Sequence, residues 1–152
     1  MLVYLDTNVF GRPFDDRSQV RVDIEAQASL AILSMIEQKK CNCLSSDILE
    51  LEVARSPLPK RIRMRSLIML CSGHISESRE VKNLAVKIFE RCQVDARDAL
   101  HIASACVGKA IYFITCDDEI TRKAKTIEED LSGFAYNLQI MNALNFIKEV
   151  IR

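Results

Sequence analysis

Short apolar runs alternate with longer segments of helical periodicity along this chain. The first run, "LVYL" at residues 2–5, is rich in residues that favour strands and is too short to be a helix. Strands that alternate with helices form parallel sheets, because the crossover helices cover both faces of the sheet. We therefore expect an α/β fold with a single domain over residues 1–152. The expected strands lie near residues 2–5, 42–45, 111–115 and 137–141, and the expected helices near residues 21–38, 47–55, 60–70, 79–92, 96–107, 118–126 and after 141.

Composition limits the class of protein and its compartment. The formal net charge is zero, so the chain lacks the overall basic field of many nucleic-acid binders, although a local basic patch remains compatible with it. The six cysteines include no CxxC pair and are scattered mostly through apolar segments, which is typical of reduced cysteines in a cytoplasmic protein. No apolar stretch approaches the length of a membrane span. We expect a cytoplasmic protein that makes no contact with a membrane.

Acidic residues follow two of the expected strands directly. Asp6 comes after the first strand, and Asp117 and Asp118 come after "IYFIT". Ligands of open parallel sheets bind outside the carboxyl ends of the strands. If these two strands are neighbours, their acids face one cleft.

Two further acids are placed by helical geometry. Glu52 falls on the apolar face of the helix expected near 47–55, whereas Glu50 points to solvent. A carboxylate on an inward face needs a cation, a proton or a salt bridge, for instance to Arg55. Asp98 follows the natural N-cap Asp95, so it lies in the first turn of a helix. Its carboxylate is there either because the helix dipole stabilises a negative charge or because it contributes to a site, and both interpretations stay open.

His101 lies three residues after Asp98. Its helical position predicts an exposed residue or one that supports a neighbouring ligand. Because no second histidine is nearby in the sequence, we do not expect a zinc site.

Four carboxylates that meet in one cleft repel one another unless a divalent cation neutralises them. Oxygen ligands select Mg²⁺ or Mn²⁺ over zinc. Such ions activate water and stabilise the oxygens of an in-line phosphoryl displacement, so phosphodiester hydrolysis is the expected reaction.

A basic segment follows Glu52. No acidic residue occurs from residue 53 to residue 76. Basic side chains of this kind hold phosphates without reading bases, although a solvated helix face is the simpler interpretation of any one of them. The residues concerned are Arg55, Lys60, Arg61, Arg63 and Arg65.

Four motifs occur in this order along the chain: "YLDTNVF", "SSDILELEV", "DALHIASA" and "FITCDDE". Together they resemble the motifs of PIN-domain ribonucleases, whose largest bacterial and archaeal group is the toxins of VapBC-type toxin–antitoxin systems. The resemblance covers about residues 1 to 145. It implies a three-layer α/β/α fold with a central parallel β-sheet and Mg²⁺- or Mn²⁺-dependent cleavage of single-stranded RNA.

The resemblance also implies site residues and partners. By position, the metal-binding and catalytic acids are Asp6, Glu52, Asp98 and Asp117, with Asn8 and Thr115 as hydrogen-bonding supports. Asp118 stands beside Asp117 as a further ligand or supporting group, and Glu119 is a third possibility. The expected partners are single-stranded or structured RNA, an antitoxin protein and a second copy of the chain.

Other functions fit the sequence less well. A phosphatase of the haloacid dehalogenase class requires DxDxT after the first strand, and a dinucleotide-binding enzyme requires GxGxxG; neither pattern occurs here. The open alternative is a nucleic-acid-binding or protein-interaction module that keeps the fold with weak catalysis.

Overall fold

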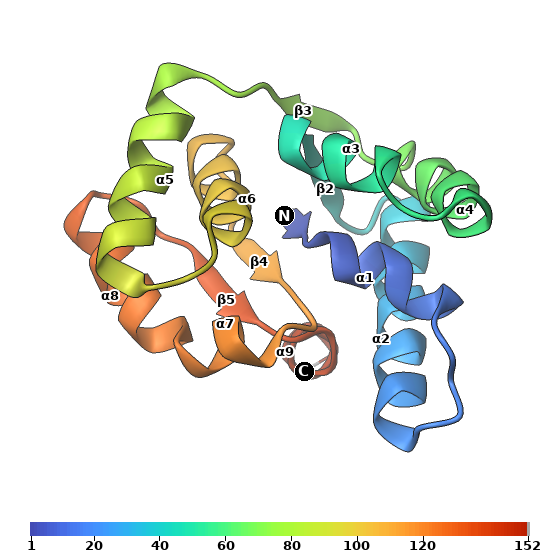
Figure 1. Cartoon of the computed structure of the whole chain (residues 1–152). Helices are drawn as coiled ribbons and strands as arrows, with labels where there is room; N and C mark the ends of the chain where they lie inside the picture. The colour runs from blue at the N-terminus through green and yellow to red at the C-terminus, as the bar shows by residue number, and fades with distance from the viewer. Residues whose placement is uncertain (152) are drawn as a thin grey trace.

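The computed structural model describes residues 1–151 and contains one parallel sheet (Figure 1). All neighbouring strands pair in parallel, in the order β3-β2-β1-β4-β5. This arrangement confirms the predicted α/β class. The strands are β1 (Leu2–Leu5), β2 (Asn42–Ser46), β3 (Gly73–Ile75), β4 (Tyr112–Ile114) and β5 (Gln139–Met141).

Helices connect the strands and cover both faces of the sheet. The described helices are α1 (Thr7–Gly11), α2 (Val20–Glu37), α3 (Asp47–Ala54), α4 (Leu58–Ile68), α5 (Arg79–Cys92), α6 (Ala96–Val107), α7 (Asp118–Arg122), α8 (Ala124–Gly133) and α9 (Ala143–Val150), with a 3₁₀ turn at Arg12–Phe14. In Figure 1, α5, α6 and α8 lie on one side of the strands, and α2 and α4 lie on the other.

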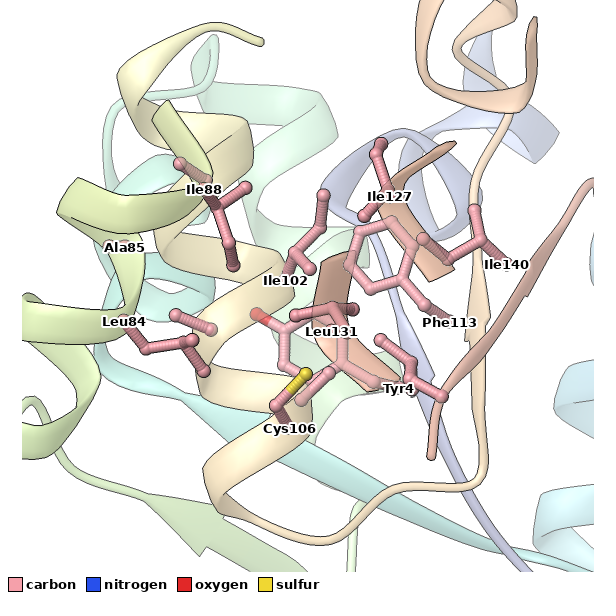
Figure 2. Close-up of a cluster of buried hydrophobic side chains, with 14 of the residues drawn as sticks. Tyr4, Leu84, Ala85, Ile88, Ile102, Cys106, Phe113, Ile127, Leu131 and Ile140 are labelled. Carbon is pink, nitrogen blue, oxygen red and sulfur yellow. The ribbon is translucent and has the colours of Figure 1, made fainter. Parts of the chain in front are cut away.

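The sheet separates two hydrophobic cores, which makes the fold a three-layer α/β/α sandwich. Successive strand side chains point to opposite faces. Tyr4 and Phe113 therefore pack with α5, α6 and α8, as Figure 2 shows. Val3 and Ile114 pack into the other core, which residues of α2, α3, α4 and α9 complete.

Three local elements differ from the predictions. Strand β3 was not expected, because it is a three-residue edge strand that is defined only by pairing with β2. Helix α1 was not expected either, since its five residues are too few to show helical periodicity. The helix expected near 118–126 is two helices, α7 and α8, with Lys123 between them.

The strand order places a crevice at the carboxyl ends of β1 and β4. The chain builds β1, β2 and β3 outward in one direction and then crosses back to place β4 on the other side of β1. Ligands of open α/β sheets bind at such a reversal of strand order. Asp6 follows β1 at this point, and Thr115 follows β4. Among residues 1–151, no helix combines the length and the apolar character needed to cross a membrane.

Candidate metal centre

Asp6 is held at the strand ends by several hydrogen bonds. Its backbone N–H donates to the Ile114 carbonyl at 2.9 Å, which extends the pairing of β1 with β4. Its Oδ1 accepts from the Thr7 N–H at 2.8 Å, and its Oδ2 accepts from Thr115 Oγ1 at 2.8 Å and from Asn8 Nδ2 at 3.2 Å. Asp6 is only 4% exposed, and this burial raises the pKa of its carboxyl.

Asn8 and Thr115 tie the first and fourth strand ends together. Asn8 Oδ1 accepts from the Cys116 N–H at 2.9 Å, and Thr115 Oγ1 accepts from the Asp117 N–H at 3.0 Å. The two side chains therefore fix Asp6 and position the backbone before Asp117.

Glu52 projects from α3 toward Asp6. The helix begins after Ser46, whose Oγ accepts from the Leu49 N–H at 3.1 Å. Glu52 Oε1 accepts hydrogen bonds from Thr7 Oγ1, at 2.5 Å, and from His101 Nε2. Burial opposes ionisation of Glu52, but the hydrogen bond and positive charge of His101 outweigh it and lower the pKa of the carboxyl. Glu50 is exposed, as the helical phase predicts.

Asp98 lies in the first turn of α6 and also lines the cleft. Asp95 caps the helix by accepting from the Arg97 N–H at 2.8 Å, so Asp98 is free of that task. Partial burial, and then the charges of Asp6, Asp117 and Asp95, raise the pKa of Asp98 to about 7. The repulsion among these carboxylates, which adds to the larger effect of burial, is of the kind that a bound cation relieves.

The cleft measures about 410 Å³. Four of the predicted metal-binding and supporting residues line it: Asp6, Asn8, Glu52 and Asp98. Other polar residues that line the cleft, among them Thr7, Asp15 and Arg97, were not predicted, because nothing in their local sequence distinguishes them from ordinary polar residues. The acids offer oxygen donors, and a carboxylate has about four acceptor sites, so the donor set fits a hard divalent cation.

The acids of the last motif lie differently. Asp117 is half-buried and does not line the cleft; its Oδ1 accepts from the Glu119 N–H at 2.8 Å as the N-cap of α7. The exposed Asp118 pairs with Arg21 of α2. Glu119 pairs with Lys123 at 3.3 Å. The structure therefore does not bring Asp118 or Glu119 into the cleft.

His101 is not exposed, which excludes the first of the two predicted possibilities, an exposed residue. It is 1% exposed, because α6 packs against α5 and α3 as well as against β2 and β4. With Asp6 and Glu52 it forms a group whose potential ligand atoms lie within 4.8 Å of one another. A second such group, Asp47, Glu50 and His74, is exposed to solvent.

The basic segment reaches the cleft only in part. Arg55 and Lys60 line it, although Lys60 Nζ is paired with Asp15 at 2.5 Å. Arg61 Nη1 donates to the Ala54 carbonyl at 3.1 Å, and the Arg63 guanidinium lies 5.5 Å from the centre of the Phe14 ring. Arg65 is exposed on α4. The predicted nucleic-acid-binding set is thus divided between the cleft and the outer surface of α4.

Comparison with known proteins identifies one family. A family model described as the PIN domain matches residues 3–126. The fold is similar to a chain in the crystal structure of VapBC2 from Rickettsia felis bound to a DNA fragment from their promoter, with a TM-score of 0.62 and 14% sequence identity. That likeness covers 93% of this chain and 98% of the other. No curated protein matches the chain.

Proposed function

The chain belongs to the PIN domain family, and from this premise we propose that it is a Mg²⁺- or Mn²⁺-dependent endoribonuclease that hydrolyses phosphodiester bonds of single-stranded RNA. The observation that carries the proposal is the convergence of Asp6, Glu52 and Asp98 on one cleft from three segments distant in sequence. A site of acids alone would repel a polyanion, so this convergence makes chemical sense with a cation present.

In this proposal, Asp6, Glu52 and Asp98 hold the metal, and Asp117, which lies outside the cleft lining, adds its negative charge near Asp98. A bound divalent ion would activate water and neutralise the charge that develops on the phosphodiester. The protein contributes the fixed positions of the carboxylates. Thr7 orients Glu52, and Asn8 and Thr115 orient Asp6, through the hydrogen bonds described above.

Basic residues at the cleft would contact the RNA backbone. Arg55 and Arg97 are both exposed and line the cleft with the acids. Lysine and arginine contacts to phosphates give affinity without sequence information. The arrangement therefore supports binding of the RNA backbone beside the acids, with base selection left to other contacts.

RNA cleavage tests the proposal. The purified protein should cut a labelled single-stranded RNA with Mn²⁺ and not with EDTA. Asp6→Asn and Asp98→Asn should each lower the rate by at least about 100-fold, a loss of about 2.7 kcal/mol of transition-state stabilisation. The matched control Asp118→Asn removes an acid outside the cleft and should keep most of the activity. Equal cutting by the parent and Asp6→Asn would reject the assignment.

The ends of the products distinguish the proposed hydrolysis from cleavage by contaminating ribonucleases that use the RNA 2′-hydroxyl. Attack by water leaves no 2′,3′-cyclic phosphate, whereas ribonucleases that use the RNA 2′-hydroxyl as nucleophile produce one. Cyclic ends would therefore reject the proposed mechanism. RNA binding without cutting, by a protein that binds Mn²⁺, would favour the alternative of a module with weak catalysis.

We extend the proposal to the protein partners. The similar fold in the VapBC2 structure supports the proposal that this chain is a toxin that an antitoxin protein neutralises. A homodimer belongs to the same proposal. Expression of the parent and of Asp6→Asn in a bacterial host tests toxicity, and light scattering of the purified chain measures its oligomeric state.

A further inference from the structure

We propose that His101 is a positioning residue for Glu52, holding that carboxylate in the cleft through a partly buried hydrogen bond, while the buried Tyr4 hydroxyl anchors the other side of the imidazole ring. The inference deepens the proposed function and rests on it, because it assigns Glu52 to the metal centre. It concerns a side chain that lies outside the four acids of the motifs.

The imidazole bridges the site and the core. Its Nε2 contacts Glu52 Oε1, and its Nδ1 lies 2.6 Å from the Tyr4 hydroxyl. Asp6 Oδ1 is farther from Nε2, at 3.7 Å. His101 is 1% exposed, so water does not compete for either nitrogen. Both ring nitrogens are therefore committed to defined partners, and Glu52 has the closer contact.

Tyr4 is a rigid anchor for this histidine. Its side chain is fully buried, and its ring stacks on Phe113 with the ring centres 5.5 Å apart and an angle of 9°. Figure 2 shows the Tyr4 ring within the hydrophobic cluster beside Phe113 and Ile102. The edge of the tyrosine also meets the His101 ring, with centres 5.7 Å apart. A ring packed on these sides fixes the position of its hydroxyl group.

The hydrogen bonds return to the helix that carries Glu52. The Tyr4 hydroxyl lies 2.6 Å from Ser46 Oγ, and Ser46 caps α3 by accepting from the Leu49 N–H at 3.1 Å. Strand β1 and helix α6 thus hold α3 at its N-terminus and again at Glu52. This double attachment gives the carboxylate a defined direction that a hydrogen bond to Thr7 alone would not provide.

The assignment holds for either charge state of the imidazole. An ionised carboxylate only accepts hydrogen bonds, so the hydrogen shared with Glu52 belongs to Nε2. The Tyr4 hydroxyl donates to Nδ1 when the ring is neutral and accepts from it when the ring is charged. The Ser46 hydroxyl donates to the Tyr4 oxygen when the ring is neutral, and it accepts from the Tyr4 hydroxyl when the ring is charged.

Two substitutions test the contributions of the two ring nitrogens of His101 separately. His101→Gln keeps an amide near the position of Nε2 and can still donate to Glu52. His101→Asn keeps an amide only near the position of Nδ1. The test measures Mn²⁺ affinity by calorimetry without RNA, with circular dichroism to confirm folding. Ser104→Ala, at another buried polar residue of α6 that belongs to neither group of potential metal ligands, is the matched control.

We expect His101→Asn to weaken Mn²⁺ binding by about 10- to 100-fold, the usual cost of losing a group that orients a metal ligand. His101→Gln should recover most of this loss, and the control should bind like the parent. Tyr4→Phe, which keeps the ring, should weaken binding by less than His101→Asn. Nitrogen NMR of the parent should show a hydrogen on Nε2.

Three results would overturn the inference. The first is parent-like Mn²⁺ affinity in folded His101→Asn, and the second is an Nε2 without hydrogen. The third is a nitrogen coupling in the pulsed electron paramagnetic resonance spectrum of bound Mn²⁺ that is lost on substitution of His101, which would make the histidine a ligand. Failure of the nuclease proposal is distinguishable, because it would appear as intact Mn²⁺ binding without RNA cleavage.

Discussion

At the scale of single residues, two opposing effects act on the ionisation of Asp98. Its place in the first turn of α6 favours a negative charge through the helix dipole. Burial and the neighbouring acids disfavour that charge and raise the pKa of Asp98 to about 7. The second effect is the stronger one in the metal-free protein, so Asp98 resists ionisation and costs stability when it is ionised.

This conflict predicts that Asp98→Asn stabilises the metal-free protein at pH 8. The folded protein keeps the Asp98 proton up to about pH 7, whereas the unfolded chain loses it near pH 4. Stability is therefore lost as the pH rises through this window, and asparagine avoids the loss. We expect a gain on the order of 1–3 kcal/mol in the free energy of unfolding by urea denaturation.

At pH 4 the same pair of proteins should differ little, because Asp98 is then protonated in the folded state. A variant less stable than the parent at pH 8 would contradict the prediction and show that the helix dipole dominates. With Mn²⁺ present the order should reverse, since only the parent keeps the ligand.

The site residues differed in how far the sequence predicted them. Glu52 could be placed because α3 buries one side and exposes the other, so helical phase is informative. His101 could not, because α6 is covered on several sides and its residues from 101 to 106 are all buried. The hydrogen bond between these two residues joins positions 49 apart in the sequence, which no local pattern contains.

At the scale of elements, the basic side chains in and before α4 do not form one surface. The sequence predicts one basic surface, but Arg61 is held by the Ala54 carbonyl and Arg63 by the ring of Phe14. Arg55 precedes α4 and lines the cleft together with Arg97 from α6. The positive charges at the cleft therefore come from two segments of the chain, of which one was predicted from the sequence.

We predict that Arg55→Ala and Arg97→Ala each weaken single-stranded RNA binding and lower its salt dependence. Each lost phosphate contact should reduce the slope of log affinity against log salt by about 0.7. The measurement is a fluorescence anisotropy titration at several salt concentrations. Arg65→Ala, on the exposed surface of α4, is the control and should leave the slope unchanged. A larger effect of Arg65→Ala would place the RNA along α4 instead of in the cleft.

Burial explains why the central strands could be predicted from the sequence and the edge strand β3 could not. The buried strands β1 and β4 have apolar residues that pack on both faces of the sheet, and these runs are visible in the sequence. Strand β3 lies at the edge and is partly exposed, with the residues Gly73, His74 and Ile75. Its pairing with β2 creates the strand, and pairing over that distance leaves no local signal.

At the scale of the whole molecule, the cleft joins segments that the chain keeps far apart. Asp6 follows β1, Glu52 belongs to α3 and Asp98 belongs to α6, and each segment is fixed to a different part of the two cores. The resemblance of the motifs predicted the set of acids. It did not predict which acids line the cleft, since that depends on how helices pack on both sides of the sheet.

This architecture predicts that Mn²⁺ stabilises the molecule as a unit. An ion held by all three segments binds the folded state alone, and at a concentration of about 100 Kd it adds about 2.7 kcal/mol. For a chain of this size the melting temperature should rise by roughly 5–10 °C. Hydrogen exchange should slow in α1, α3 and the first turn of α6 together, because opening any one of them releases the ion.

Asp6→Asn should abolish both effects, whereas Asp118→Asn, outside the cleft, should preserve them. A different pattern of protection would contradict the prediction. If Mn²⁺ protected β3 and the start of α3 while α6 exchanged as before, the ion would occupy the exposed group of Asp47, Glu50 and His74. Because the two groups share α3 but not α6, exchange in α6 decides whether the cleft is the metal centre of this protein.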